Sequence, residues 1–153
     1  MSIDIRLATS DELSRAVGLI AALLPELDEA ARVIDTTKSS ALMAQVHAEG
    51  ANHLMFVAIA DRTEIVGAAT VAQSFALFGG GRYGIINEMV VDREWRRRGI
   101  GGGLLAEIAN EATKRGWTSV EVTTAESEDG VLGRLFYEGQ GFGPVGAKLQ
   151  LLL

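Results

Sequence analysis

The chain has 153 residues, a net charge of −6 at pH 7 and no cysteine, and 48% of its residues are hydrophobic. This length suits one ordinary domain with a single core, and the composition favours a packed globular protein over a disordered one. The lack of cysteine excludes disulfides, thiolate metal sites and a cysteine nucleophile, and the acidic charge disfavours DNA or another polyanion as a partner.

The same features bear on metals and on location. Two histidines, His47 and His53, are too few for a histidine metal cluster, and no carboxylate spacing suggests a metal site, so we expect no metal. The start of the chain lacks the apolar core of a secretory signal, and no apolar run approaches the roughly 20 residues that a membrane span needs. We therefore expect a soluble, cytoplasmic protein with one domain, residues 1–153, and no membrane partner.

The chain is expected to begin with a strand and a helix. Residues 2–8 alternate apolar and polar side chains, as a half-buried strand does. Thr9 and Glu12 have the spacing of a capping box, which marks the start of a helix. We predict that helix over about residues 10–24, and we expect Pro25 to end it.

A second helix and a hairpin follow. Residues 37–49 have helical spacing of apolar side chains, and Gly50 is suited to cap the helix. The continuously apolar run 54–60 predicts a strand covered on both faces. The polar link DRTE joins it to a second strand over residues 65–72, and so short a link implies an antiparallel pair.

The next segment is expected to be a loop, a strand and a helix. Residues 74–82 contain three consecutive glycines and predict a flexible loop. Residues 83–91 predict a strand, and helical spacing returns from residue 100 to a basic last turn that Gly116 caps. Residues 118–124 predict a strand parallel to 83–91, joined to it by a right-handed crossover.

The last third completes the predicted order with a short helix over residues 131–138 and a final strand over residues 145–153. The apolar ending LQLLL allows two readings, a strand that pairs with a second copy in a homodimer or a buried strand of the monomer. The whole order predicts one mixed sheet with helices.

The stretch EWRRRGIGGGLL, residues 94–105, places arginines and glycines where a helix begins. A glycine in a helix costs about 0.5–1 kcal/mol relative to alanine, so this cluster asks for a compensating role. Bare N–H groups in the first turn can face a phosphate at the positive end of the helix dipole, and the arginines add charge-assisted hydrogen bonds. We interpret the stretch as an anion cradle rather than a loosely capped helix.

Two phosphate motifs compete for this stretch. Gly101, Gly103 and Ala106 fit the dinucleotide pattern G-x-G-x-x-A, and Glu121 lies 20 residues after the first glycine. In that fold, however, the glycines turn tightly off the strand, whereas DREWRRR separates the strand from the glycines here. A nicotinamide-dependent oxidoreductase therefore ranks as the least favoured function.

The second motif carries a resemblance. RRRGIG, residues 96–101, matches [QR]-x-x-G-x-[GA], and here the chain resembles the GNAT superfamily of acetyl-CoA-dependent N-acetyltransferases. NEMVVDREW upstream and FYEGQGF downstream resemble that family's fourth strand and its late tyrosine segment. The resemblance implies an α/β (α+β) fold with a mixed, mostly antiparallel sheet of six to seven strands, about four helices, and splayed fourth and fifth strands.

The resemblance also implies a function, transfer of an acetyl group from acetyl-CoA to a primary amine on a small molecule or peptide. The glycine turn would hold the pyrophosphate of coenzyme A and the preceding strand would pair with its pantetheine arm. The residues so implied are Met89, Val90, Val91, Arg96, Arg97, Arg98, Gly99, Ile100, Gly101 and Gly102. Because the chain has no cysteine to carry an acetyl group, direct transfer in a ternary complex is favoured.

Two residues are candidates for moving protons. Tyr137 matches the family tyrosine near the cofactor thiol and would act as general acid. Glu88 is the only carboxylate in its strand and is the candidate base. Neighbouring strand residues point to opposite faces, so if Asn87 faces the cleft the base would be water, Glu121 or Glu126. Glu88 could instead pair with the arginine cluster.

Further features leave the acceptor open. Many relatives carry asparagine and alanine where this chain has Gly130 and Gly133. Gly130, together with the open choice of base, favours as an alternative function an acyl-CoA-sensing module without efficient catalysis. By the resemblance, residues 74–82 and 24–37 would border the acceptor cleft. The acids there, which either draw a cationic amine or are simply solvated, are Glu26, Asp28 and Glu29.

Overall fold

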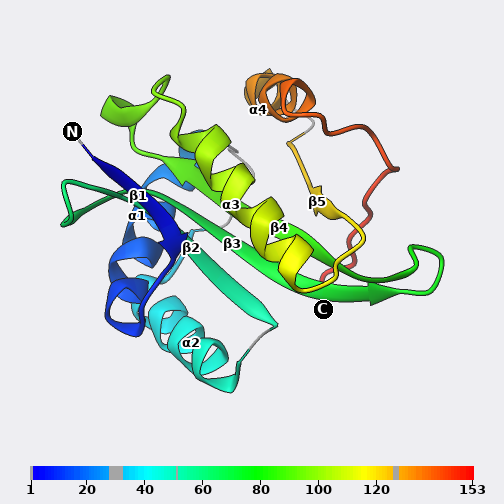
Figure 1. Cartoon of the computed structure of the whole chain (residues 1–153), viewed down its shortest axis with the longest axis horizontal. Coiled ribbons are helices and arrows are strands. Elements are labelled where there is room, and N and C mark those ends of the chain that lie inside the picture. Colours follow the sequence, from blue (N-terminus) through cyan, green and yellow to red (C-terminus); the bar gives the residue numbers. More distant parts are fainter. Residues whose placement is uncertain (1, 28–32, 51, 126–127) are drawn as a thin grey trace.

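One sheet of five strands organises the molecule (Figure 1). The computed structural model describes residues 2–27, 33–50, 52–125 and 128–153. The strands lie side by side in chain order, antiparallel from the first to the fourth, and the fifth is parallel to the fourth. They are β1 (Ile3–Leu7), β2 (His53–Ala60), β3 (Glu64–Ala76), β4 (Gly81–Val91) and β5 (Val120–Val122).

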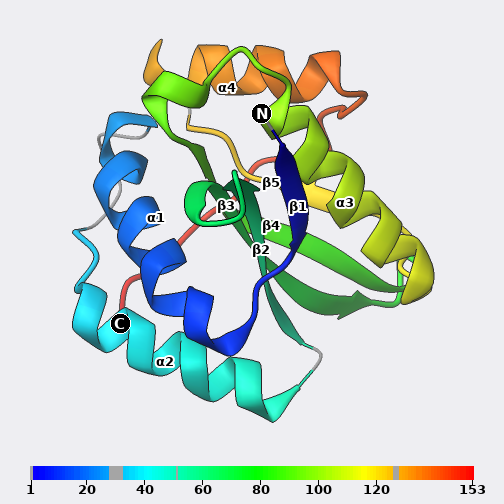
Figure 2. The same ribbon diagram turned by 60° about the vertical axis from the view of Figure 1, so that its left-hand side comes forward.

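Four α-helices of the described chain cover the two faces of this sheet. α1 and α2 lie against one face and α3 against the other (Figure 2), and α4 packs beside α3. Short 3-10 turns, η1 (Ser10–Glu12) and η2 (Arg93–Trp95), precede two of the helices. The helices are α1 (Leu13–Leu27), α2 (Thr36–Glu49), α3 (Ile100–Lys114) and α4 (Glu128–Gly139).

β2 runs through the middle of the core, and the prediction that its apolar run is covered on both faces is confirmed. Phe56 and its alternate neighbours pack in the cluster beneath α3, whereas Met55 and Val57 pack in the cluster beneath α1. Phe56 and Val57 are both fully buried. The strand needs no polar face because a helical layer lies on each side.

The capping box predicted at Thr9 and Glu12 is confirmed. The Thr9 N–H donates to the Glu12 carboxylate at 2.8 Å. Two nitrogens of Arg6 on β1 also donate to this carboxylate, at 2.8 and 2.9 Å. These contacts lower the pKa of Glu12 to about 2, first of all through the Arg6 hydrogen bonds, and they fasten the start of α1 to the edge of the sheet.

Two predicted boundaries were wrong. α1 continues through Pro25 to Leu27, because proline removes only its own N–H bond and here lies in the last turn. Residues 74–82 are mostly strand rather than a flexible loop, since β3 reaches Ala76, which pairs with Gly81 at the start of β4. Gly80 and Gly81, at φ values of 84° and 136°, let the chain reverse within four residues.

The predicted final strand over residues 145–153 is also wrong, so the sheet has five strands and not six or seven. Residues 142–153 form no helix or strand, and Leu149 and Leu151 are 93% and 85% exposed. With only three residues, β5 gives a further strand a short edge to pair with. The reading of LQLLL as a buried strand of the monomer fails with it.

Candidate functional site

The residues between β4 and α3 form a turn with unused backbone donors. We call residues 96–102 the phosphate turn, after the ligand that the sequence predicts for it. Gly99 adopts the left-handed conformation, at φ 80°, and α3 starts at the next residue. The first helical bond in this region joins the Gly103 N–H to the Gly99 carbonyl at 2.9 Å. Within the described chain, no acceptor is found for the N–H groups of Gly99, Ile100, Gly101 and Gly102.

Packing accounts for two of the glycines in and beside this turn. A Cβ on Gly101 would lie 3.0 Å from the Phe136 ring of α4, and one on Gly103 would lie 2.5 Å from Ile5 of β1. A Cβ on Gly102 would meet nothing closer than Gln140, at 3.7 Å. The glycine cluster therefore allows α4 and β1 to approach α3 closely, in addition to exposing the backbone. The sequence pattern did not reveal this packing role.

The arginines of the turn have different surroundings. Arg96 donates from Nε to the Val91 carbonyl at 2.9 Å, which ties the turn back to the end of β4. The Arg98 guanidinium lies 4.8 Å from the centre of the Trp95 ring. Arg97 is exposed and has a positive φ of 60°. The three predicted cofactor arginines are therefore brought together at one turn, and Arg97 extends into solvent.

Glu26, at the C-terminal end of α1, is the carboxylate that pairs with this region. It accepts hydrogen bonds from Arg93 and lies 3.7 Å from an Arg96 nitrogen. The Arg93 contacts lower the pKa of Glu26. Arginines therefore pair with its charge, which argues against the interpretation that Glu26 attracts a cationic amine. Asp28 and Glu29 lie outside the described residues.

β4 has an open edge next to the turn. β5 pairs only with residues 84–86 of β4, although β4 continues to Val91. Among the described strands, none pairs with Met89, Val90 or Val91 on that side. The predicted splay between the fourth and fifth strands is confirmed, and it leaves backbone donors and acceptors that an extended ligand can use.

A β-bulge decides which way Glu88 points. Thr70 pairs with Glu88 and Val71 with Ile86, so Asn87 is an extra residue in β4. Ile86 packs beneath α3, while Val90 packs beneath α1, because the bulge changes the facing of the strand. Asn87 is exposed and Glu88 turns toward the α1 and α2 layer.

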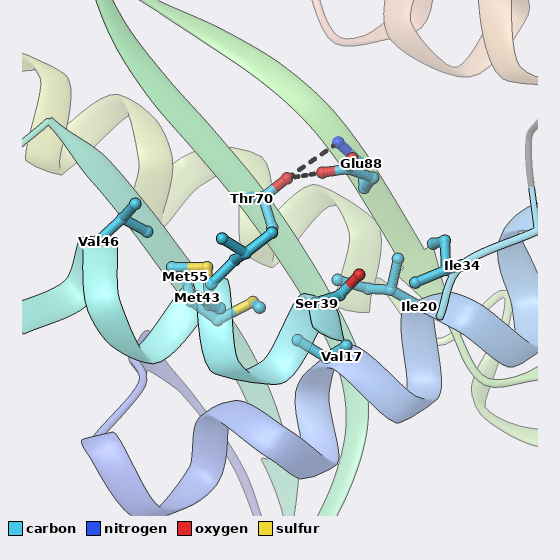
Figure 3. A pocket seen from close by; sticks show the side chains of 10 residues that line it. Val17, Ile20, Ile34, Ser39, Met43, Val46, Met55, Thr70 and Glu88 are labelled. Atoms are coloured by element: carbon cyan, nitrogen blue, oxygen red, sulfur yellow. Dashed lines mark hydrogen bonds between the residues drawn. The ribbon is translucent and has the colours of Figure 1, made fainter. Parts of the chain in front are cut away.

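Glu88 borders a pocket of about 280 Å³ between the sheet and helices α1 and α2. Figure 3 shows Glu88 and Thr70 on neighbouring strands, with the Thr70 hydroxyl donating to the Glu88 carboxylate. The Glu88 N–H in turn donates to the same hydroxyl at 3.2 Å. We call this space the Glu88 pocket, and it is lined by Val17, Ile20, Ile34, Ser39, Leu42, Met43, Val46, Met55, Thr70 and Glu88.

These contacts answer one alternative from the sequence. Glu88 makes no ion pair with the arginine cluster among the described residues, and Glu26 takes that place. No sequence pattern indicated the Thr70 partner, which is 18 residues away and becomes a neighbour only through the β3–β4 pairing.

Tyr137 lies on α4 and packs on the α3 side of the sheet. Its ring makes edge contacts with Phe136 and Phe142, with centroids 5.2 and 5.3 Å apart. Burial raises the pKa of Tyr137 to about 12, so the phenol keeps its proton at neutral pH. Tyr137 does not line the Glu88 pocket, so the structure does not bring the two predicted catalytic side chains into one cavity.

A second cavity, of about 220 Å³, lies beside the first turns of α3 and was not foreseen from the sequence. Gly102 borders it on one side, and Gln140 and Phe142 border it on the other. This cavity therefore lies next to the phosphate turn. No cluster of three or more metal-ligating side chains occurs in the part of the chain that the structure describes. No described helix has the length and apolar character to cross a membrane.

Solved structures share this fold over nearly the whole chain. A transcriptional regulator from Bacillus halodurans C-125 superposes with a TM-score of 0.80 and 24% identity, over 99% of this chain and 100% of that one. A predicted acetyltransferase with acetyl-CoA from Clostridium acetobutylicum gives 0.80 and 22%, over 99% and 96%. The aminoglycoside acetyltransferase meta-AAC0020 from an uncultured soil sample, in complex with trehalose, gives 0.76 and 20%, over 99% and 96%.

Sequence comparison identifies the family. No curated protein matches the chain. The family model described as the acetyltransferase (GNAT) domain matches residues 51–144, which is more than half of the chain and includes β4, the phosphate turn and α3. The chain therefore belongs to the GNAT acetyltransferase family.

Proposed function

We propose that this chain is an N-acetyltransferase that moves an acetyl group from acetyl-CoA to a primary amine by direct transfer. The observation that carries the proposal is the row of N–H groups at Gly99, Ile100, Gly101 and Gly102, for which the described residues provide no acceptor. They begin α3, where the helix dipole favours an anion, and they adjoin the unpaired edge of β4.

These groups fit coenzyme A in two parts. The backbone of residues 97–102 would hold the pyrophosphate, with Arg96, Arg97 and Arg98 supplying positive charge around it. The unpaired edge at Met89, Val90 and Val91 would accept the pantetheine arm as an added strand. Both parts lie on one continuous stretch of chain, so a single ligand can use both.

The catalytic roles follow from which side of β4 each residue occupies. Acetyl-CoA supplies the acetyl group as a thioester that an amine can attack. Glu88 accepts a proton from the incoming ammonium, directly or through one water, so that the nitrogen becomes nucleophilic. Tyr137 donates its phenolic proton to the departing sulfur from the α3 side of the sheet and is then reprotonated.

The step balances in atoms and protons. The bond between the acetyl carbon and sulfur breaks, and a bond between that carbon and the amine nitrogen forms. The ammonium loses two protons in becoming an amide, one of which replaces the proton that Tyr137 gave to sulfur, while the other is released to solution. No oxidant, reductant or metal is needed.

Two measurements test this function. Calorimetry with coenzyme A should show binding, and release of free thiol from acetyl-CoA in the presence of primary amines should show turnover. The matched control is the same chain with Arg97 and Arg98 both changed to alanine, which should bind coenzyme A more weakly. Absence of coenzyme A binding by the unaltered chain would remove the proposal.

A second function, acyl-CoA sensing without efficient catalysis, is favoured by one observation. Tyr137 and Glu88 share neither a cavity nor a contact among the described residues. Normal coenzyme A affinity without thiol release for any amine would support sensing. The nicotinamide alternative has no support in the fold, because four strands of the sheet form an antiparallel meander.

A homodimer is part of the proposal, and a cytoplasmic location stays a prediction of the sequence. The exposed leucines near the C-terminus, among them Leu149 and Leu151, support contact with a second copy. Light scattering on the full chain, compared with a chain carrying serine at both positions, should show a dimer that the variant loses.

A further inference from the structure

The Glu88 pocket holds one charge in apolar surroundings. Among the described residues, ten line the pocket; seven of these are aliphatic or methionine, and only Glu88 carries a charge. Its carboxylate accepts from the Thr70 hydroxyl and pairs with no lysine, arginine or histidine among residues 2–27, 33–50, 52–125 and 128–153. A carboxylate sheltered by apolar walls is stabilised by a cation, so the pocket is complementary to a single ammonium.

The helix above the pocket has an apolar side that is only partly covered by the core, against which Met43 packs. None of the described residues of α2 is buried, although Leu42, Met43 and Val46 are apolar and line the pocket. By contrast, Val17 and Ile20 of α1, which also line the pocket, are 6% and 4% exposed. The apolar side of α2 therefore faces space that another molecule can occupy.

We infer that the acceptor is a monoamine whose single ammonium is joined to a compact apolar group, a branched aliphatic chain or one aromatic ring. This inference rests on the proposed N-acetyltransferase function and assigns the Glu88 pocket as its acceptor site. At about 30 Å³ for each water-sized group, a pocket of about 280 Å³ holds roughly ten non-hydrogen atoms. The ammonium binds at Glu88 and the apolar group lies among Val17, Met43 and Val46.

The same walls select against polycations. A second ammonium on the acceptor would have to enter the region of Met43, Val46 and Met55, where no other lining side chain within the described ranges carries negative charge. Burying a charge without a partner is costly, so polyamines and aminoglycosides are poor acceptors for this chain. We therefore do not expect this chain to share the acceptor of the aminoglycoside acetyltransferase that has the same fold.

A matched series of amines tests the inference. The probes are ethylamine, 3-methylbutylamine and 2-phenylethylamine, which share one ammonium and differ in apolar size, together with spermidine and the uncharged 2-phenylethanol. Filling the pocket should raise kcat/KM for 2-phenylethylamine at least about tenfold above ethylamine and above spermidine, in line with the discrimination that apolar groups provide. A kcat/KM for spermidine equal to or above that for 2-phenylethylamine would overturn the inference.

A pair of variants on α2 tests where the apolar group lies. Val46→Asp places a carboxylate in the pocket, whereas Ala44→Asp places the same charge on the same helix at an exposed position that does not line the pocket. Val46→Asp should lower kcat/KM for 2-phenylethylamine at least about tenfold, and Ala44→Asp should change it less than about twofold. Thermal unfolding of both variants checks that each is folded, and equal effects from the two would contradict the assignment.

Binding without acetyl-CoA separates this inference from the proposed function. Calorimetry should show that 2-phenylethylamine binds, that 2-phenylethanol binds at least about tenfold more weakly, and that Val46→Asp weakens the amine. If coenzyme A fails to bind but these differences hold, the enzyme assignment fails and the pocket assignment stands. If coenzyme A binds and the amine and alcohol bind equally, the pocket assignment fails and the enzyme assignment stands.

Discussion

The phosphate turn follows β4 and the Glu88 pocket borders it, yet the two sites are built in different ways. The turn comes from one continuous stretch, residues 96–102, and its shape depends on a left-handed glycine and a helix start. The pocket draws its walls from α1, α2, β2, β3 and β4, and its charge points inward only because Asn87 is bulged. One site is therefore encoded locally, and the other exists only once distant elements have paired.

This contrast predicts that variants on the two sides of β4 will affect different steps. Groups at the turn and on α4 should govern the cofactor and the departing sulfur. Groups in the Glu88 pocket should govern the amine. Each variant below can contradict this prediction, because coenzyme A affinity reports on the cofactor side and turnover of the amine reports on the amine side.

The largest effect is expected from Tyr137→Phe. Removing the phenolic hydroxyl takes away the proposed proton donor, so kcat should fall about a hundredfold while coenzyme A affinity stays unchanged. The ring and its contacts with Phe136 and Phe142 remain. Steady-state thiol release and calorimetry measure the two quantities, and Tyr83→Phe, the other tyrosine of the chain, is the matched control. Unchanged kcat in Tyr137→Phe would favour the sensing function.

Glu88→Gln should have the next largest effect, on the amine side. Loss of the carboxylate removes the proposed base and the partner of the ammonium, and kcat/KM for the amine should fall about thirtyfold, since water can still accept the proton. The dissociation constant of coenzyme A should not change. Glu121→Gln on β5 is the control, because Glu121 is the other described carboxylate that the sequence offered as a base. A larger loss in Glu121→Gln would reassign the base.

Arg97→Ala should act on the cofactor side alone. Removing an exposed guanidinium at the phosphate turn should weaken coenzyme A about tenfold, and the difference should shrink as salt is raised. Arg62→Ala is a close match, since Arg62 is also exposed and also has a positive φ, 70° against 60° at Arg97. Equal affinities in the two variants would show that Arg97 does not meet the phosphate.

The sequence predicted the fold and the turn better than the pocket, and the reason is physical. The continuous apolar run of β2, the capping box at Thr9 and the glycines of the turn are local patterns, and the structure keeps each of them. The bulge at Asn87 and the Thr70 partner of Glu88 depend on register between β3 and β4, which no local pattern specifies.

The errors of element length have related causes. Glycines 79–81 predict a loop because they permit one, whereas strand pairing on both sides leaves only a four-residue turn. The leucines after residue 148 have the alternation of a strand, but among the described strands they find no partner, and they remain exposed. Apolar alternation allows a strand, and pairing decides whether one forms.

The smallest effect on turnover is expected from Glu12→Gln, which tests how the pocket wall is held. Glu12 joins Arg6 of β1 to the start of α1, and α1 supplies Val17 and Ile20 to the pocket. Losing these charge-assisted bonds should lower the free energy of unfolding by about 2 kcal/mol near neutral pH. Coenzyme A affinity should not change, because the phosphate turn does not depend on this contact.

The pH dependence of that loss has a definite sign. Because the folded pKa of Glu12 is lowered from 4.5 to about 2, its contribution is fully present above pH 4.5 and is lost as the pH falls through 2. Denaturant unfolding should therefore show a constant gap between the unaltered chain and Glu12→Gln above pH 4.5 that closes below it. Asp4→Asn, which removes an exposed carboxylate from the same Arg6, should cost less than about 1 kcal/mol. If the gap persisted at the acid end, the stabilisation would not come from the charge of Glu12.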